Sequence, residues 1–129
     1  MLSRDALKTA NDSVIETVIV SEWDNTEFFI RRLGGTERSQ FEESLLEEKI
    51  IRDSKGRKKT IRKVELSKAK AKLVVLCCVI SPVDETLYFQ SDDWKWLSDK
   101  SASALEKLYT VAQRLAGMSS EDMEEISGN

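Results

Sequence analysis

The most regular alternation of apolar and polar residues lies between Ser101 and Gly117. Apolar residues recur there at intervals of three and four, which is the spacing of one face of an α-helix. Gly117 can adopt the positive φ that often ends a helix, and the Arg114 side chain suits the negative end of the helix dipole. The pattern predicts an amphipathic helix that packs against the chain's own core or against another protein. Its apolar positions are Leu105, Leu108, Tyr109, Ala112, Leu115 and Ala116.

Two segments near the N-terminus, 14–20 and 27–33, are rich in β-branched or aromatic residues. Such residues favour strands. The stretch between them, 21–26, contains an Asp-Asn pair that suits a turn. The pattern predicts a β-hairpin, and Trp23 is expected either to shield the hairpin from water or to contact a partner.

Helices are predicted on both sides of this hairpin. A short helix at 3–9 has Ser3 in position to cap it, because a serine hydroxyl can accept a bond from a free N–H of the first turn. A second helix is predicted to begin after Thr36, to pass Leu46 and to continue toward Lys49.

Residues 67–80 begin with good helix formers and end in a continuous apolar run. A helix with a buried C-terminal half is the preferred interpretation, although periodicity alone also allows a strand at 73–80. Ser91 is expected to cap a further short helix that reaches Leu97.

Together these segments predict an α+β fold that is predominantly helical, with the N-terminal β-hairpin packed on a helical core. Tyr109 and Val111 are expected on an exposed shoulder of the last helix, where they could contact a partner. The predicted core consists of Phe41, Leu45, Leu73, Leu76, Ile80, Leu105, Leu108, Ala112 and Leu115.

The chain has 129 residues, of which 40% are hydrophobic and 33% are charged. This length suits a single domain over 1–129 with one core. The longest apolar run, at 73–80, is much shorter than the ~20 residues that cross a bilayer, and the N-terminus lacks the pattern of a secretory signal. We therefore expect no membrane association and a cytoplasmic location.

Charge is strongly segregated along the chain. The block 49–72 carries a net charge of +9, whereas the other residues together carry −12. Residues 50–66 are predicted to form a basic, flexible loop, because a turn signal at 53–57 is followed by no sustained period. This loop could be solvated, could contact an acidic protein through Arg57, Lys58 and Lys59, or could bind nucleic acid. Nucleic acid is the least favoured partner, because the block contains no aromatic residue to stack on a base.

The C-terminal segment 118–129 is predicted to be an acidic helix or tail. Its candidate partner-binding residues are Glu121, Asp122, Glu124 and Glu125. The basic segment of one copy could meet this acidic segment of the next, and a repeated head-to-tail contact of that kind builds a spiral or filament.

No catalytic, cofactor-binding or metal-binding residues are predicted. The chain contains no His, and the adjacent Cys77 and Cys78 lie in an apolar run, where they are expected to be reduced and buried. The carboxylates of Asp92 and Asp93 suit the first turn of a helix, where they need no chemical role. We therefore expect a protein that is not an enzyme.

Taken in order, these segments resemble the tail assembly chaperones of long-tailed bacteriophages and their prophage relatives. The resemblance covers nearly the whole chain, and it departs from the family at the long basic stretch 52–63 and at Ser21, where a proline is commoner. The segments that carry it are LSRDALKTAND, ETVIVSEWDNTEFFIRRLGGTERSQFE, AKLVVLCCVI, LYFQSDDWKWLSDKSASALEKLYTVAQRLAG and MSSEDMEEISGN.

The resemblance implies a small protein of the host cytoplasm that acts during phage morphogenesis and is absent from the mature virion. Its partners would be the tape-measure protein, which it keeps soluble, and the tail tube protein that polymerises around it. The family also implies a second, frameshifted form that is extended near the C-terminus. The alternative function is that of a small phage nucleic-acid-binding or regulatory protein that uses the basic block 52–72.

Overall fold

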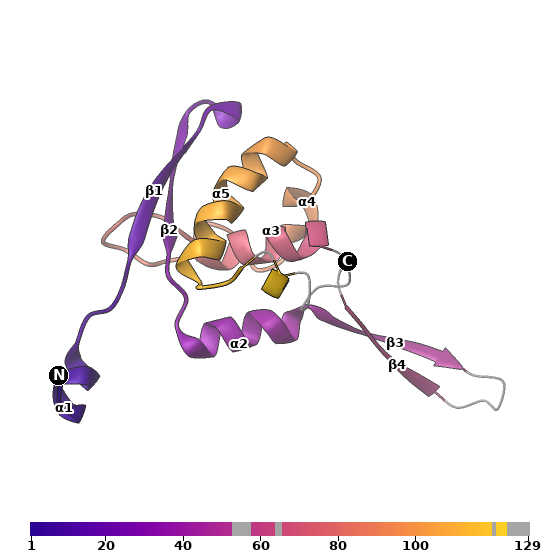
Figure 1. Ribbon diagram of the computed structural model, residues 1–129. Helices are drawn as coiled ribbons and strands as arrows, with labels where there is room; N and C mark the ends of the chain where they lie inside the picture. Colours follow the sequence, from indigo (N-terminus) through magenta and orange to yellow (C-terminus); the bar gives the residue numbers. More distant parts are fainter. Residues whose placement is uncertain (53–57, 64–65, 120, 124–129) are drawn as a thin grey trace.

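The computed structural model describes residues 1–52, 58–63, 66–119 and 121–123, and for 46–52 and 58–63 it describes the backbone alone. Figure 1 shows a central body of sheet and helices, from which two segments extend. These are the N-terminal helix α1 (Arg4–Thr9) and a ribbon formed by strands β3 (Leu46–Arg52) and β4 (Lys58–Lys63).

The predicted N-terminal hairpin is confirmed. Strand β1 (Ile15–Val20) pairs antiparallel with β2 (Thr26–Arg31), and the 3-10 turn η1 (Ser21–Trp23) connects them. Asp24 and Asn25 follow this turn with φ values of 58° and 54°. Asp and Asn tolerate this left-handed conformation better than most other residues, so the sequence suits the sharp reversal.

Helix α3 (Leu66–Cys77) leads directly into strand β5 (Cys78–Val79), which pairs antiparallel with β2. The sheet order is therefore β1-β2-β5. The preferred helix is confirmed as far as Cys77, and the alternative of a strand holds only for the two residues after it. Ile80 was expected in the core, but its side chain is 47% exposed because it lies beyond the strand.

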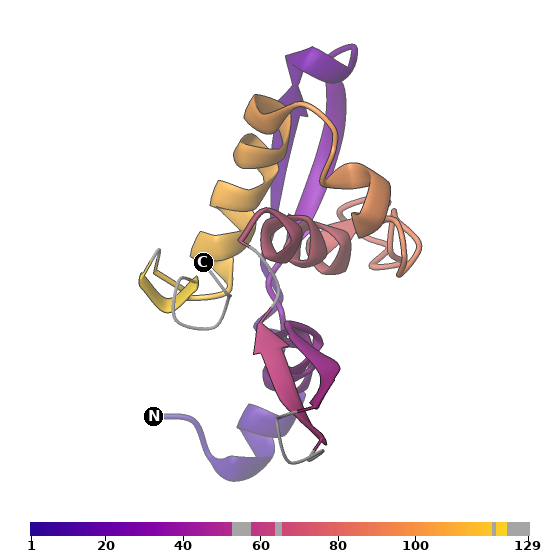
Figure 2. The same cartoon turned by 90° about the vertical axis from the view of Figure 1, so that its right-hand side faces the viewer.

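The core lies between this sheet and the helices that cover it, as the rotated view in Figure 2 shows. Helix α5 (Ala102–Leu115) packs against β1, β2 and α3, and α3 also contacts the short helix α4 (Trp94–Leu97). Six of the nine predicted core residues are buried, whereas Leu76 and Leu115 are half-buried and Ile80 is exposed. The six are Phe41, Leu45, Leu73, Leu105, Leu108 and Ala112.

The ends of α5 confirm the predicted helix. Ser101 caps it, because its Oγ accepts a hydrogen bond from the N–H of Ala104 at 3.3 Å. Gly117 has a φ of 70° and turns the chain so that Met118 and Met123 can cover the core.

Helix α2 (Gly35–Ser44) differs from the prediction at both ends. Its N-cap is Gly34 instead of Thr36, and the Gly34 N–H donates to Oε1 of Glu37 at 3.2 Å. The helix was expected to continue toward Lys49, but it ends at Ser44 with Leu45 as its C-cap, because the next residues pair as strand β3.

Residues 50–66 were expected to form a basic, flexible loop, but the described residues 50–52 and 58–63 lie in strands. Strands β3 and β4 pair antiparallel, with Leu46 opposite Lys63 and Arg52 opposite Lys58. The predicted turn at 53–57 lies outside the described residues. Figures 1 and 2 show the ribbon pointing away from the body, at the opposite end from η1.

The cap of α1 is confirmed, because Ser3 Oγ accepts from the N–H of Ala6 at 3.2 Å. The cap expected at Ser91 is wrong. Asp93 precedes α4 and accepts a bond from the N–H of Gln90 at 2.8 Å, so the chain reverses in a turn before the helix begins.

Candidate partner-binding surfaces

Five of the nine aromatic side chains of this protein gather in one cluster, which we call the aromatic cluster. Phe28 of β2 lies at its centre, with ring centroids 5.7 Å from Trp23, 5.3 Å from Tyr88 and 6.4 Å from Phe89. Trp96 of α4 continues the cluster from Phe89 at 6.0 Å. Edge-to-face and stacked arrangements at these separations are favourable for aromatic rings.

The aromatic cluster is only partly closed. Phe28 and Phe89 are buried, whereas Tyr88 and Trp96 remain 51% and 47% exposed. Together they line a mainly apolar pocket of about 290 Å³, which Thr26, Leu97 and Lys100 complete. The arrangement can accept an apolar side chain from another molecule, because rigid rings offer contact area at a low entropy cost.

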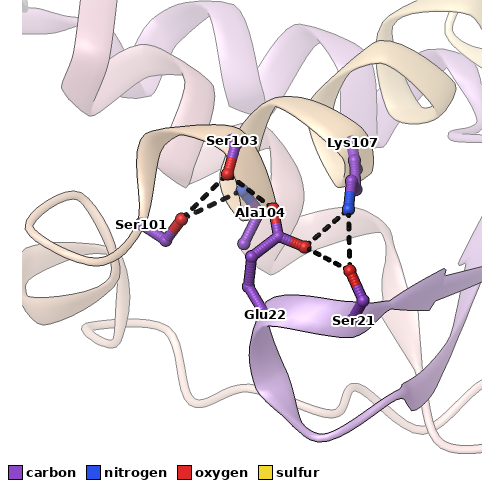
Figure 3. Close-up of polar contacts among 6 residues, drawn as sticks. All are labelled: Ser21, Glu22, Ser101, Ser103, Ala104 and Lys107. Carbon is purple, nitrogen blue, oxygen red and sulfur yellow. Dashed lines mark hydrogen bonds and ion pairs between the residues drawn. The ribbon is translucent and has the colours of Figure 1, made fainter.

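The position of Trp23 depends on a polar connection between η1 and α5, drawn in Figure 3. Glu22 accepts hydrogen bonds from Lys107 Nζ and from Ser103 Oγ, both at 2.5 Å. Lys107 also donates to Ser21 Oγ at 3.3 Å. The bonds from Lys107 and Ser103 lower the pKa of Glu22 to about 2. This connection holds the turn that carries Trp23 against the start of α5.

Trp96 is oriented from the other side of the pocket. Its indole Nε1–H donates to Asp93 Oδ1 at 3.0 Å, while the second carboxylate oxygen of Asp93 holds the backbone of Gln90. The ring therefore keeps a defined direction although it is about half exposed.

The segments that line the pocket are acidic. Residues 23–28 and 88–100 together contain five carboxylates and two lysines. A bound segment with basic residues beside its apolar anchor would match both the pocket and this charge. The carboxylates are Asp24, Glu27, Asp92, Asp93 and Asp99.

Two predicted partner-binding residues on α5 lie apart from this cluster. Tyr109 is not on an exposed shoulder: it is 4% exposed, and Lys70 Nζ lies 4.9 Å from its ring centroid. Burial and the nearby Glu106 raise the pKa of Tyr109 to about 12. Val111 is half-buried and lines a different groove with Val18 and Ile19.

The predicted acidic residues are described only in part. Glu121 is exposed, and Asp122 is bound to Ser119, whose N–H donates to Asp122 Oδ2 at 2.9 Å. Hydrogen bonding with the backbone and side chain of Ser119 lowers the pKa of Asp122. Glu124 and Glu125 lie outside the described residues.

The predicted basic residues are described even less. Arg57 lies outside the described residues, and for Lys58 and Lys59 the structure describes only the backbone of β4. A partner-binding role for these residues stays a prediction.

Sequence patterns indicated Trp23 but not the residues that surround it. Tyr88, Phe89 and Trp96 stand in short segments without a regular period. The high proportion of aromatic residues in these segments was the one signal that could have indicated the cluster. Phe28 and Tyr88 are 60 residues apart along the chain, yet their ring centroids lie 5.3 Å apart. No local pattern indicates this contact.

Comparison with known proteins gives one family. A family model described as phage tail assembly chaperone matches residues 3–127. Comparisons with curated proteins and with solved structures gave no match. Within the described residues, no helix is both long enough and apolar enough to span a bilayer. The match covers almost the whole chain, and this protein therefore belongs to the phage tail assembly chaperone family.

Proposed function

We propose that this protein keeps the tape-measure protein soluble in the host cytoplasm and brings tail tube subunits to it, without catalysis and without entering the mature virion. Family membership supports a role in tail assembly. Client binding is supported by the aromatic cluster, whose pocket of about 290 Å³ is mainly apolar and is lined by the half-exposed rings of Tyr88 and Trp96.

The chemistry of the cluster suits a helical client. A long helix that has not yet been enclosed by its tube exposes apolar side chains at intervals of three and four residues. One of these side chains can enter the pocket between Tyr88 and Trp96, while the surrounding carboxylates keep the complex in solution. Client segments with Lys or Arg next to the anchor would bind best.

Recruitment of tube subunits needs a second surface that stays accessible while the client is bound. The β3–β4 ribbon is our candidate, because Figures 1 and 2 show it at the opposite end of the body from η1, which carries Trp23. Its sequence, at 46–63, is rich in lysine and arginine, so an acidic surface of the tube protein would suit it.

The test is co-expression with the tape-measure protein, with the soluble client measured after centrifugation. A double variant, Tyr88→Ser with Trp96→Ser, should lower the soluble client severalfold. The matched control is Val83→Ser, because Val83 is 95% exposed but does not line the pocket. Equal client solubility with the double variant and the control would contradict a client site at the cluster, provided that circular dichroism shows both chains folded.

The alternative function, nucleic-acid binding by the block 52–72, has less support. Two of its cations already have partners inside the protein: Lys70 forms an ion pair with Glu106 at 3.0 Å, and Lys72 donates to the Ser44 carbonyl at 2.6 Å. Replacing five basic residues at 57–63 by Gln should weaken any DNA binding and its salt dependence sharply. The same variant should still keep the client soluble if our proposal is right.

The segregated charge also supports self-association, in which the basic segment of one copy meets the acidic C-terminal segment of the next. Such a contact is electrostatic, so it should weaken as salt is raised. Sedimentation at low and high salt tests it. A monomer that persists at low salt and high protein concentration would contradict this contact.

A further inference from the structure

The two edges of the three-stranded sheet differ in their hydrogen bonding. The β5 edge is covered, because the Ile80 N–H donates to the Thr86 carbonyl at 3.0 Å and the Tyr88 N–H donates to the Cys78 carbonyl at 2.9 Å. In the part of the chain that the structure describes, no strand pairs with the outer edge of β1.

The pairing with β2 determines which groups of β1 face outward. The Arg32 N–H donates to the Val14 carbonyl at 2.9 Å, which marks residues 14 and 32 as a hydrogen-bonded pair. Such pairs alternate along antiparallel strands. The backbone N–H and C=O groups of Ile15, Thr17 and Ile19 therefore point away from β2, along the free edge.

This edge lacks the features that usually prevent strands from associating. Edge strands are commonly protected by lysine, proline or a bulge. The sequence of β1, IETVIV, contains no lysine or proline, and its register with β2 is continuous. Its one charged residue, Glu16, is already paired with Arg114, and Ile19 is 59% exposed.

A groove follows the same edge. It measures about 560 Å³ and lies between β1 and α5, lined by Val18 and Ile19 of β1 and by Ser103, Glu106, Lys107, Thr110 and Val111 of α5. Val18 and Ile19 are neighbours on one strand, so their side chains point to opposite faces of the sheet. A groove that both of them line together with α5 reaches the outer edge of β1, where a further strand would lie.

We propose that β1 pairs antiparallel with β1 of a second copy, about a two-fold axis at Thr17, to give a continuous six-stranded sheet. In this register Thr17 lies opposite Thr17 of the second copy, and Ile15 lies opposite Ile19. All three direct their free backbone groups toward the partner strand. An isologous contact of this kind closes a dimer.

The charges of β1 do not oppose a second copy as the occupant of this edge. Glu16 of one copy lies opposite Val18 of the other, so no like charges face each other across the strands. Each Glu16 carboxylate is also held by Arg114 of its own chain, so the copies bring together ion pairs of zero net charge. This dimer differs from a head-to-tail contact between basic and acidic segments, because salt should not dissociate it.

The register is tested by cross-linking. Directly opposed residues of a hydrogen-bonded pair lie about 5.5 Å apart between Cα atoms, which a disulfide can span. Thr17→Cys should give a covalent dimer under mild oxidation, whereas Ser39→Cys, at an exposed site on α2, should remain monomeric. Equal cross-linking of both variants, or none with Thr17→Cys, would overturn the register.

The pairing itself is tested by sedimentation equilibrium. Thr17→Pro removes an outward N–H that the monomer does not use, so we expect a folded monomer in place of a dimer. Val18→Pro is the contrasting control: it removes an N–H bonded to β2 and should unfold the chain. Ile19→Lys should also give a folded monomer, which covers the case in which Thr17→Pro fails to fold. A monomeric unmodified protein at every concentration, or a dimer that Ile19→Lys leaves intact, would overturn the proposal.

Discussion

The apolar side chains under α5 and those of the aromatic cluster differ in how far folding closes them. Leu73, Leu108 and Ala112 have no exposed surface, whereas Tyr88 and Trp96 keep about half of theirs. Most of the apolar surface under α5 is buried within one chain, so it contributes to stability. The aromatic cluster retains apolar surface that only a second molecule can cover, which makes it the better candidate for binding.

The largest expected effect comes from the closed region. Leu108→Ala removes a fully buried side chain and should lower the free energy of unfolding by about 2–5 kcal/mol. Denaturant unfolding measures this. Client solubility per folded molecule should stay unchanged. A loss of client binding in the folded variant would contradict the assignment of stability to the core under α5 and of binding to the aromatic cluster.

Trp96→Ala should lower stability less than Leu108→Ala does, but it should weaken client binding. Because its ring is about half exposed, we expect about 1.5–2.5 kcal/mol of destabilisation, which is half of the loss for a buried tryptophan. Client binding should weaken at least tenfold. The same unfolding and co-expression measurements, made beside Leu108→Ala, show whether stability and binding separate as expected.

A smaller effect is expected where the chain closes the core after α5. Gly117→Ala places a side chain at a φ of 70° and should cost about 1–2 kcal/mol of unfolding free energy. Gly35→Ala is the matched control, because no heavy atom lies within 4 Å of an added Cβ and the residue belongs to α2. The control should be neutral or slightly stabilising, and equal losses in both variants would contradict a conformational cause.

The smallest effect concerns the polar connection behind Trp23. The pKa of Glu22 falls from 4.5 to about 2 in the folded chain, so its carboxylate is more stable there than in the unfolded chain. Its contribution is present above pH 4.5 and is lost as the pH falls toward 2. Glu22→Gln should flatten the decline of unfolding free energy across that window. A decline identical to that of the unmodified chain would show that other carboxylates cause it.

The sequence was sufficient to predict the elements in which apolar residues recur with helical or strand spacing. Helix α5 and the β1–β2 hairpin follow from spacing and turn residues alone. The burial of Tyr109 also agrees with its place in the apolar stripe of α5, and the error was to expect it on an exposed shoulder.

Other features depend on contacts between distant parts of the chain. Residues 58–63 are KKTIRK, which has little intrinsic preference for a strand, and their pairing with 46–52 decides the structure. The aromatic cluster forms because 86–88 returns beside β5, which brings Tyr88 to Phe28. No periodicity within a segment contains that information.

Helix α3 passes directly into strand β5, and the two cysteines at this junction can report on opening of the core. Cys77 ends the helix and Cys78 begins the strand, and both thiols are free and buried. Burial raises the pKa of Cys77 to about 12 and that of Cys78 further, so neither sulfur forms the reactive thiolate in the folded chain. A thiol reagent can label them only when helix and strand separate, and the labelling rate therefore counts how often the core opens.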